Sequence, residues 1–153
     1  MSSGSFDDRH NLPLIRLLDE ALEGFSFELG KRIAQSGYND VRPSHGCVFG
    51  NIDRDGSRLT DLAERAHMTK QSVGEITSDL EKRGYVERVP DPNDGRAKII
   101  RLTDRGREAR VAGRQMIDEI EREWAERFGA ERVAALRDAL EVITAERLGA
   151  VPV

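Results

Sequence analysis

Apolar residues in the first quarter of the chain recur at intervals of three and four positions, the spacing of one face of an α-helix. This stripe consists of Leu14, Leu18, Ala21, Leu22, Phe25, Leu29 and Ile33. It predicts a helix over residues 13–35, with Pro13 suited to its first turn. Polar and glycine residues at 36–40 break the pattern, and a short helix is expected to begin near Pro43.

Two short helices with a tight break between them are predicted in the centre of the chain. Thr60 is a suitable N-cap for the first, which is about seven residues long. After a break at 67–68, Thr69 is a suitable N-cap for a second helix over residues 70–83, which Gly84 is suited to terminate. The apolar positions of this second helix are Val73, Ile76 and Leu80, which leaves its opposite face polar.

The pattern then changes to the alternation typical of β-strands. Strands are predicted over residues 85–89 and 98–102, joined by a turn over 91–96 whose Asp94-Gly95 dipeptide forms the hairpin tip. Two long helices should follow. Thr103 is placed to cap the first, whose apolar positions are Ala109, Ala112, Met116, Ile120, Trp124 and Phe128. Gly129 interrupts the pattern, and the last helix carries Val133, Leu136, Leu140, Ile143 and Leu148 before it ends at Gly149.

This order of elements predicts a mainly α protein with a small β-hairpin wing, the arrangement of a winged helix-turn-helix. We expect a flexible tail over 1–12, N-terminal helices over 13–54, the winged helix-turn-helix over 55–102, C-terminal helices over 103–149 and a tail over 150–153. The stripes of the N- and C-terminal helices have little else to pack against in a chain of this length. We therefore expect these helices to support the module and to form a homodimer across a two-fold axis.

The polar face of the second short helix is suited to the major groove of double-stranded DNA. Small and hydrogen-bonding residues lie towards its N-terminal end, namely Lys70, Gln71, Ser72, Gly74 and Thr77. Gln71 can bind adenine through two hydrogen bonds, and Lys70 can bind guanine or phosphate. The hairpin would place Arg96 at the minor groove, whose negative potential attracts a guanidinium group.

Charge and composition change this interpretation little. The net charge is −4, but residues 57–107 carry 11 Lys and Arg against 9 Asp and Glu, while the remainder carries 13 against 19. A mildly basic centre within an acidic scaffold favours a DNA-reading module. No apolar run reaches the roughly 20 residues that cross a membrane, no secretory signal is visible, and Cys47 is the single cysteine. We expect a cytoplasmic protein with no membrane partner.

The central segment resembles the MarR family of regulators. The likeness is carried by LTDLAERAHMTKQSV at 59–73 and LEKRGYVER at 80–88, and it extends through DPNDGRAK at 91–98 and LTDRG at 102–106. The resemblance implies homodimers with interlocked terminal helices and a recognition helix that begins at Thr69. It also implies a wing in which an aspartate helps to hold the wing in place and an arginine reaches the minor groove.

Together, these arguments predict a transcriptional regulator, a repressor, acting as a homodimer on an inverted-repeat operator. The predicted DNA-binding residues are Thr69, Lys70, Gln71, Ser72, Gly74, Glu75, Thr77, Asp94, Arg96 and Lys98. Gly74 and Glu75 stand where many relatives carry serine or arginine. Glu75 can accept a hydrogen bond from cytosine or be repelled by phosphate, and Gly74 allows a close backbone approach to DNA.

The resemblance also implies release by a small lipophilic or phenolic effector, with Phe25, Cys47, Phe49 and Met116 as the candidate pocket. Two alternatives remain open: a redox-responsive regulator that acts through Cys47, and a winged-helix adaptor that binds protein. His10, His45 and His67 are too scattered to predict a metal site, and no residue pattern predicts a cofactor or an enzyme.

Overall fold

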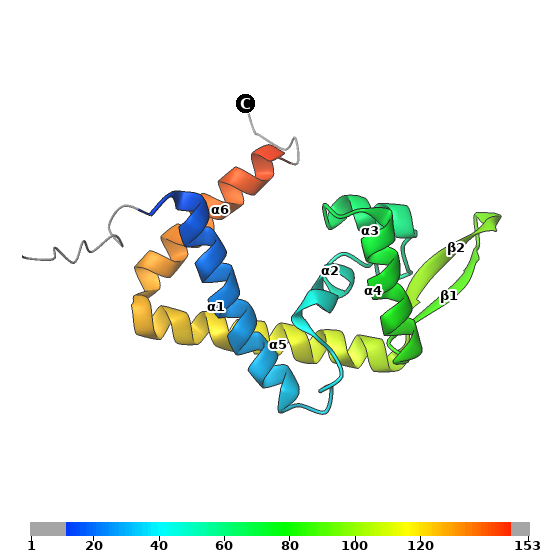
Figure 1. Ribbon diagram of the computed structural model, residues 1–153, viewed down its shortest axis with the longest axis horizontal. Coiled ribbons are helices and arrows are strands. Elements are labelled where there is room, and N and C mark those ends of the chain that lie inside the picture. Colours follow the sequence, from blue (N-terminus) through cyan, green and yellow to red (C-terminus); the bar gives the residue numbers. More distant parts are fainter. Residues whose placement is uncertain (1–11, 148–153) are drawn as a thin grey trace, which may run out of the picture. The chain divides into compact units, whose positions relative to one another are not determined.

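A computed structural model describes residues 12–147 of the chain, which divide at Arg110 and Val111 into two compact units. The elements are α1 (Leu14–Ala34), η2 (Pro43–His45), α2 (Gly46–Phe49), α3 (Leu59–Arg65), α4 (Lys70–Lys82), β1 (Val86–Asp91), β2 (Asp94–Leu102), α5 (Asp104–Phe128) and α6 (Ala130–Arg147) (Figure 1). The first unit runs to Arg110 in the second turn of α5. The second contains the rest of α5 and α6. The predicted fold class, mainly helical with one antiparallel hairpin, is confirmed.

The first unit has a single hydrophobic core around the two short helices. Its buried members are Val48, Ile52, Leu62, Ala63, Val73, Leu80, Tyr85, Val86, Ile100, Leu102 and Ala109. They come from α2, α3, α4, both strands and the first turns of α5. Because every element of the winged helix-turn-helix contributes a side chain, this core fixes the crossing of α3 and α4 and the position of the hairpin beside them (Figure 1).

Both ends of α4 are fixed by local hydrogen bonds, as predicted. The Thr69 hydroxyl accepts from the backbone N–H of Ser72 at 3.1 Å, an N-cap. At the other end Gly84 has a φ of +79°, and the N–H of Tyr85 donates to the carbonyl of Leu80. This is the Schellman arrangement, in which a left-handed residue closes the helix.

The start of α3 differs from the prediction, because the helix begins at Leu59 and Thr60 lies inside its first turn. Arg58 holds the N-cap position without a side-chain cap. The cause is a backbone pairing between residues that are far apart in the sequence. The N–H and C=O of Ser57 pair with the backbone of Ile100 at 2.9 and 2.8 Å, so strand β2 holds the chain extended until just before the helix.

The hairpin tip also differs from the prediction. The ladder runs in regular register from Val86 opposite Leu102 to Pro90 opposite Lys98, and it closes where Asp91 faces Asp94. The tip is therefore Pro92-Asn93, and the predicted Asp94-Gly95 tip is wrong. The Asp91 carboxylate accepts from the N–H of Asn93 at 2.9 Å, and proline fixes the φ of the first turn residue, so the turn forms two residues earlier.

The beginning of α5 is tied to the end of α4. The Thr103 hydroxyl accepts from the N–H of Gly106 at 3.1 Å, as predicted for a cap, and donates to the carbonyl of Gly84 at 2.6 Å. A Cβ atom on Gly106 would lie 1.9 Å from the carbonyl oxygen of Tyr85. Only glycine allows this approach, which sets the hairpin and α4 against α5.

Helices α1 and α6 leave large apolar side chains uncovered. Ile15 is 77% exposed, Leu22 and Phe27 are each 66% exposed, and Val142 on α6 is 71% exposed. In the second unit Gly129, with φ +103°, separates α5 from α6. The predicted helix end at Leu148 and Gly149 lies outside the described residues. Over residues 12–147, no helix has the length and apolar character needed to cross a membrane.

Candidate nucleic-acid interface

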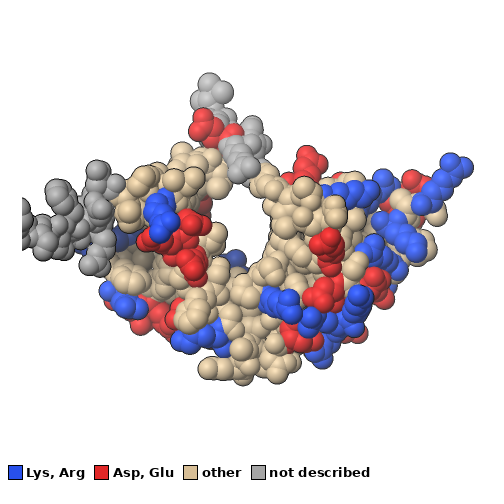
Figure 2. All heavy atoms as spheres, in the orientation of Figure 1, with Lys and Arg blue, Asp and Glu red and all other residues tan. Residues whose placement is uncertain are grey.

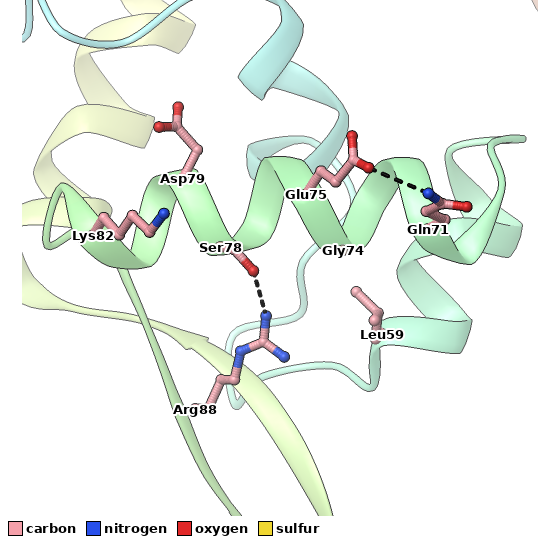
Figure 3. Close-up of a pocket in the computed structure, with 8 residues that line it drawn as sticks. All are labelled: Leu59, Gln71, Gly74, Glu75, Ser78, Asp79, Lys82 and Arg88. Atoms are coloured by element: carbon pink, nitrogen blue, oxygen red, sulfur yellow. Dashed lines mark hydrogen bonds between the residues drawn. The ribbon is translucent and has the colours of Figure 1, made fainter.

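The exposed face of α4 is a polar surface that borders a shallow groove. The groove is lined by Leu59, Gln71, Gly74, Glu75, Ser78, Asp79, Lys82 and Arg88 (Figure 3). Thr69, Lys70, Gln71 and Glu75 are exposed, and Ser72 and Gly74 are half-buried. The structure therefore brings most of the predicted contact residues to one surface of the helix.

Thr77 is an exception, and its prediction as a DNA contact is wrong. Its side chain is completely buried, and its hydroxyl donates to the carbonyl of Val73 at 2.7 Å. It lies between Val73 and Leu80 on the core face of α4. The helical spacing already placed it there, since these positions differ by four and three residues. A threonine can occupy such a site because its hydroxyl is satisfied by the preceding turn.

Besides Leu59 and Asp79, three groove-lining residues were not among the predicted sites: Ser78, Lys82 and Arg88. Ser78 and Lys82 continue the face that begins at Gln71 at helical spacing, so the sequence contained a signal for them. Arg88 comes from β1, and its guanidinium donates to Ser78 Oγ at 3.1 Å and to Glu81 Oε2 at 3.2 Å. These bonds join the hairpin to the recognition surface, and helical periodicity could not have identified them.

Gly74 and Glu75, the two unusual residues, lie in the middle of the exposed face (Figure 3). The carboxylate of Glu75 accepts a long hydrogen bond from Nε2 of Gln71 at 3.4 Å. A Cβ on Gly74 would meet only the Leu59 side chain, at an ordinary 3.6 Å. The fold therefore does not require glycine at this position.

The wing is anchored by a buried carboxylate that sequence reasoning did not identify. Asp91 is 7% exposed, and its Oδ2 accepts from Arg58 Nη2 at 2.7 Å and from Arg58 Nε at 2.9 Å. The hydrogen bond from the Asn93 backbone and that from Arg58 lower the pKa of Asp91. Since Arg58 immediately precedes α3, this pair fixes the hairpin tip to the helix-turn-helix.

Asp94, the aspartate predicted to hold the wing, has a more local position. It lies 4.0 Å from the Arg58 guanidinium, and its Oδ1 accepts from the backbone N–H of Arg96 at 3.1 Å. Its carboxylate therefore shapes the turn that presents Arg96. Arg96 and Lys98 are both exposed, and lysine and arginine side chains gather along the hairpin (Figure 2).

A buried histidine supports α4 from behind. His45 is 3% exposed; its Nε2 donates to Oδ2 of Asp79 on α4 at 2.9 Å, and its Nδ1 accepts from the N–H of Arg42 at 3.1 Å. Burial lowers the pKa of His45, although Asp79 opposes the shift. Arg83 donates to the same Asp79 oxygen at 2.9 Å. His45 is thus a buried structural group that joins η2 to α4.

The C-terminal end of α4 is held by a second polar cluster around Tyr85. Its hydroxyl donates to Oδ1 of Asp40 and accepts from Arg105 at 3.0 Å, while the Arg105 guanidinium lies 4.8 Å from the ring centre. Arg83 donates to the carbonyl of Asp40 at 3.0 Å. The loop before η2 and the start of α5 are therefore joined to Tyr85, which follows the Gly84 terminator of α4.

The candidate effector residues are distributed over both units. Phe25 is on α1, Cys47 and Phe49 are on α2, and Met116 belongs to the second unit. The Phe49 ring packs edge-on against Tyr85 with centroids 6.1 Å apart, and the groove along α4 is lined by none of the four. Burial raises the pKa of the Cys47 thiol, which disfavours the reactive thiolate. The pocket stays a prediction, and the position of Cys47 gives no support to redox sensing.

The described histidines do not form a metal site. His45 is used in the bonds described above, and His67 lies in the turn between α3 and α4, with a φ of +53°. His10 lies outside the described residues. Across residues 12–147, no three histidine, cysteine, aspartate or glutamate side chains are grouped so that they could bind a metal ion.

Comparison with known proteins shows that the segment containing this site is similar to a described family. The sequence profile of the MarR family matches residues 39–97. The transcriptional activator of exopolysaccharide II synthesis ExpG of Rhizobium meliloti is 26% identical over 71% of the chain and 56% of its own length. The transcriptional regulator HosA of Escherichia coli O111:H- is 29% identical over 60% of the chain and 67% of its own length.

The fold is shared with solved structures over most of the chain. The transcriptional repressor CouR, bound to a 23-mer DNA duplex, has a TM-score of 0.78 and 23% identity over 94% of this chain and 99% of that one. CouR from Rhodococcus jostii RHA1 bound to p-coumaroyl-CoA has a TM-score of 0.68 and 24% identity over 83% of this chain and 88% of that one.

Proposed function

This chain belongs to the MarR family of winged helix-turn-helix transcriptional regulators, and from that premise we propose that it represses transcription as a homodimer bound to an inverted-repeat operator. The observation that carries the proposal is the exposed polar face of α4 beside a hairpin fixed by the Arg58–Asp91 pair. A rigid helix with a polar face and a positioned basic wing are the features with which a winged helix-turn-helix binds DNA. The DNA duplex bound by CouR supports the same use of the fold.

In the proposed complex, α4 enters the major groove. Lys70 and Gln71, both exposed in its first turn, contact phosphate and base edges. Arg96 and Lys98 extend from the hairpin to the neighbouring minor groove and backbone. Asp94 contributes by shaping the turn that presents Arg96.

The uncovered apolar side chains of α1 and α6 support the homodimer. Ile15, Leu22 and Phe27 on α1 and Val142 and Ile143 on α6 are all more than half exposed. A soluble chain rarely leaves so much apolar surface to water, and burial against a second copy removes it. Two recognition helices about 34 Å apart would then match half-sites one helical turn apart.

A small lipophilic effector completes the proposal. CouR has been solved with p-coumaroyl-CoA, an aromatic acyl thioester. A phenolic or related ligand held by the first unit near Phe25, Cys47 and Phe49 would change the spacing of the recognition helices and release the operator. Its test is the operator affinity of the dimer across a panel of phenolic acids and their thioesters. Unchanged affinity across that panel would remove the effector from the proposal.

The central test is a mobility-shift titration with DNA from upstream of the protein's own gene, at several salt concentrations and with excess random competitor. We expect tight, salt-sensitive and competitor-resistant binding with a two-fold symmetric footprint. Arg96→Ala should weaken binding and reduce the salt slope by about one for each protomer of the dimer. Arg16→Ala, which removes an exposed arginine from α1, is the charge-matched control and should leave the slope unchanged. Binding no tighter than to the competitor would contradict operator recognition.

A further inference from the structure

The recognition face of α4 has an unusual order of charges. Lys70 and Lys82 lie near its two ends, about 18 Å apart at the rise of an α-helix, and Glu75 lies between them. Within residues 12–147, the Glu75 carboxylate forms no ion pair with a basic side chain, and its hydrogen-bond partner is Gln71. A cation is favoured beside phosphate, whereas an unpaired carboxylate there is penalised. The basic side chains that attract phosphate therefore lie near the two ends of the helix, and a hydrogen-bond acceptor lies in its middle.

We propose that Glu75 determines sequence specificity, selecting a cytosine at one position of each operator half-site. The inference rests on the proposed DNA binding and assigns a base preference to it. In the major groove the hydrogen-bond donors are the amino groups of cytosine and adenine. The adenine amino group lies between two acceptors, its own N7 and O4 of thymine, and both repel a carboxylate. The cytosine amino group has one such neighbour, O6 of guanine, and a C5–H on its other side. A carboxylate that enters the major groove therefore favours a C·G pair over the alternatives.

The hydrogen bond between Gln71 and Glu75 strengthens this assignment. Because Nε2 of Gln71 donates to Glu75, the carbonyl oxygen of Gln71 points away from Glu75 and is available as a second acceptor (Figure 3). The two residues are one helical turn apart, about 6 Å along the axis, and base pairs are spaced at about 3.4 Å. The pair would therefore read base pairs one or two steps apart, and Gln71 would not act independently.

Gly74 makes the approach of Glu75 to the bases feasible. It lies directly beside Glu75 on the exposed face, where no side chain adds bulk between the helix backbone and the groove (Figure 3). The interior of the fold leaves room for a methyl group at this position. A glycine that the core does not need fits a helix that approaches DNA closely at its second turn.

The experiment is selection of bound duplexes from a library with randomised half-sites, using the full-length chain, followed by competition titrations on the four duplexes that differ at the selected position. The wild type should prefer cytosine at that position by roughly 5- to 150-fold over the least favoured base. Glu75→Gln should move the preference towards adenine, because an amide both donates and accepts, and Glu75→Ala should abolish the preference. Thermal unfolding of each variant checks that the exposed substitution leaves the fold intact.

Glu64→Gln is the matched control, since Glu64 is an exposed carboxylate on α3 of the same helix-turn-helix. It should leave all base preferences as in the wild type. If Glu75→Gln raises affinity equally for every duplex and leaves base preference unchanged, Glu75 acts only as a repulsive charge and the inference is overturned. If the wild type and the control both select no sequence, DNA reading itself is contradicted, and the two failures are thereby distinguished.

Discussion

The helix-turn-helix buries its apolar residues, whereas helix α1 leaves most of its apolar residues exposed. Leu62, Val73 and Leu80 are completely buried in the core shared by α2, α3, α4 and the hairpin. On α1, Ile33 is the one buried residue, while Leu22 and Phe27 are each 66% exposed. Both segments have helical apolar periodicity, so the pattern alone does not distinguish them.

The difference lies in what each segment has to pack against within one chain. The winged helix-turn-helix has enough elements to enclose its own core, and this leaves α4 free to present a polar face. Helix α1 presents a stripe that its own chain leaves uncovered, which is the state expected of half an interface. A self-sufficient reading module and an incomplete dimerisation element are therefore combined in one small protein.

The largest effect on stability should come from Gly106→Ala, which disrupts the packing of α5 within the winged helix-turn-helix. The added methyl group would lie 1.9 Å from the Tyr85 carbonyl oxygen, so α5 must shift away from the end of α4. We expect a loss of about 3 kcal/mol in the free energy of unfolding, measured by urea denaturation. Gly113→Ala in the same helix meets nothing within 4 Å and should be neutral or stabilising by up to about 1 kcal/mol. Equal stability of the two variants would contradict this packing.

Leu22→Ala tests whether the exposed apolar side chains of α1 form a dimer interface. If the exposed part of this side chain is buried in a dimer, its truncation should weaken dimerisation by about 1 to 2 kcal/mol, or roughly 5- to 30-fold in the dissociation constant. Sedimentation equilibrium measures that constant. Glu23→Ala, which alters an exposed polar neighbour, should have little effect. A dimer insensitive to Leu22→Ala would place its interface elsewhere.

The buried His45 predicts a pH dependence confined to the first unit. Its pKa is lowered in the folded protein, so between that value and the ordinary value near 6.5 the unfolded chain binds a proton that the folded chain does not. Stability should therefore be complete above about pH 6.5 and should fall as the pH drops below it. Urea midpoints between pH 8 and 5 measure the effect. His45→Gln should be less stable at pH 8 and should depend less on pH, and an unchanged pH profile would show that another group titrates.

Gly74→Ala should give the smallest change in stability and separates folding from DNA reading. Its methyl group fits, so helix propensity should raise the free energy of unfolding by up to about 1 kcal/mol. If α4 approaches DNA closely at this turn, operator affinity should nevertheless fall several-fold in the mobility-shift titration. Gly24→Ala on α1, where a methyl group also meets nothing, should leave DNA affinity unchanged. A Gly74→Ala variant with full affinity would contradict the close approach.

Much of the candidate site followed from the sequence because its signals are local. The Thr69 cap, the Gly84 terminator and the exposed stripe of α4 each depend on residues within one or two turns. Thr77 was misassigned because its polar chemistry was given more weight than its helical spacing. The exposed positions of Arg96 and Lys98 followed from the hairpin pattern, although the tip was placed at the wrong dipeptide.

The sequence by itself determined the order of the helices and strands, the polar face of α4 and the resemblance to the MarR family, since these depend on periodicity, caps and short runs of residues. Only the tertiary structure decided how that face is held. His45 reaches Asp79 across 34 positions, Arg58 reaches Asp91 across 33, and Tyr85 reaches Asp40 across 45. The physical reason is that a cap or a helical stripe is satisfied by its neighbours in the chain. A polar contact between distant segments forms only after the hydrophobic core has brought those segments together.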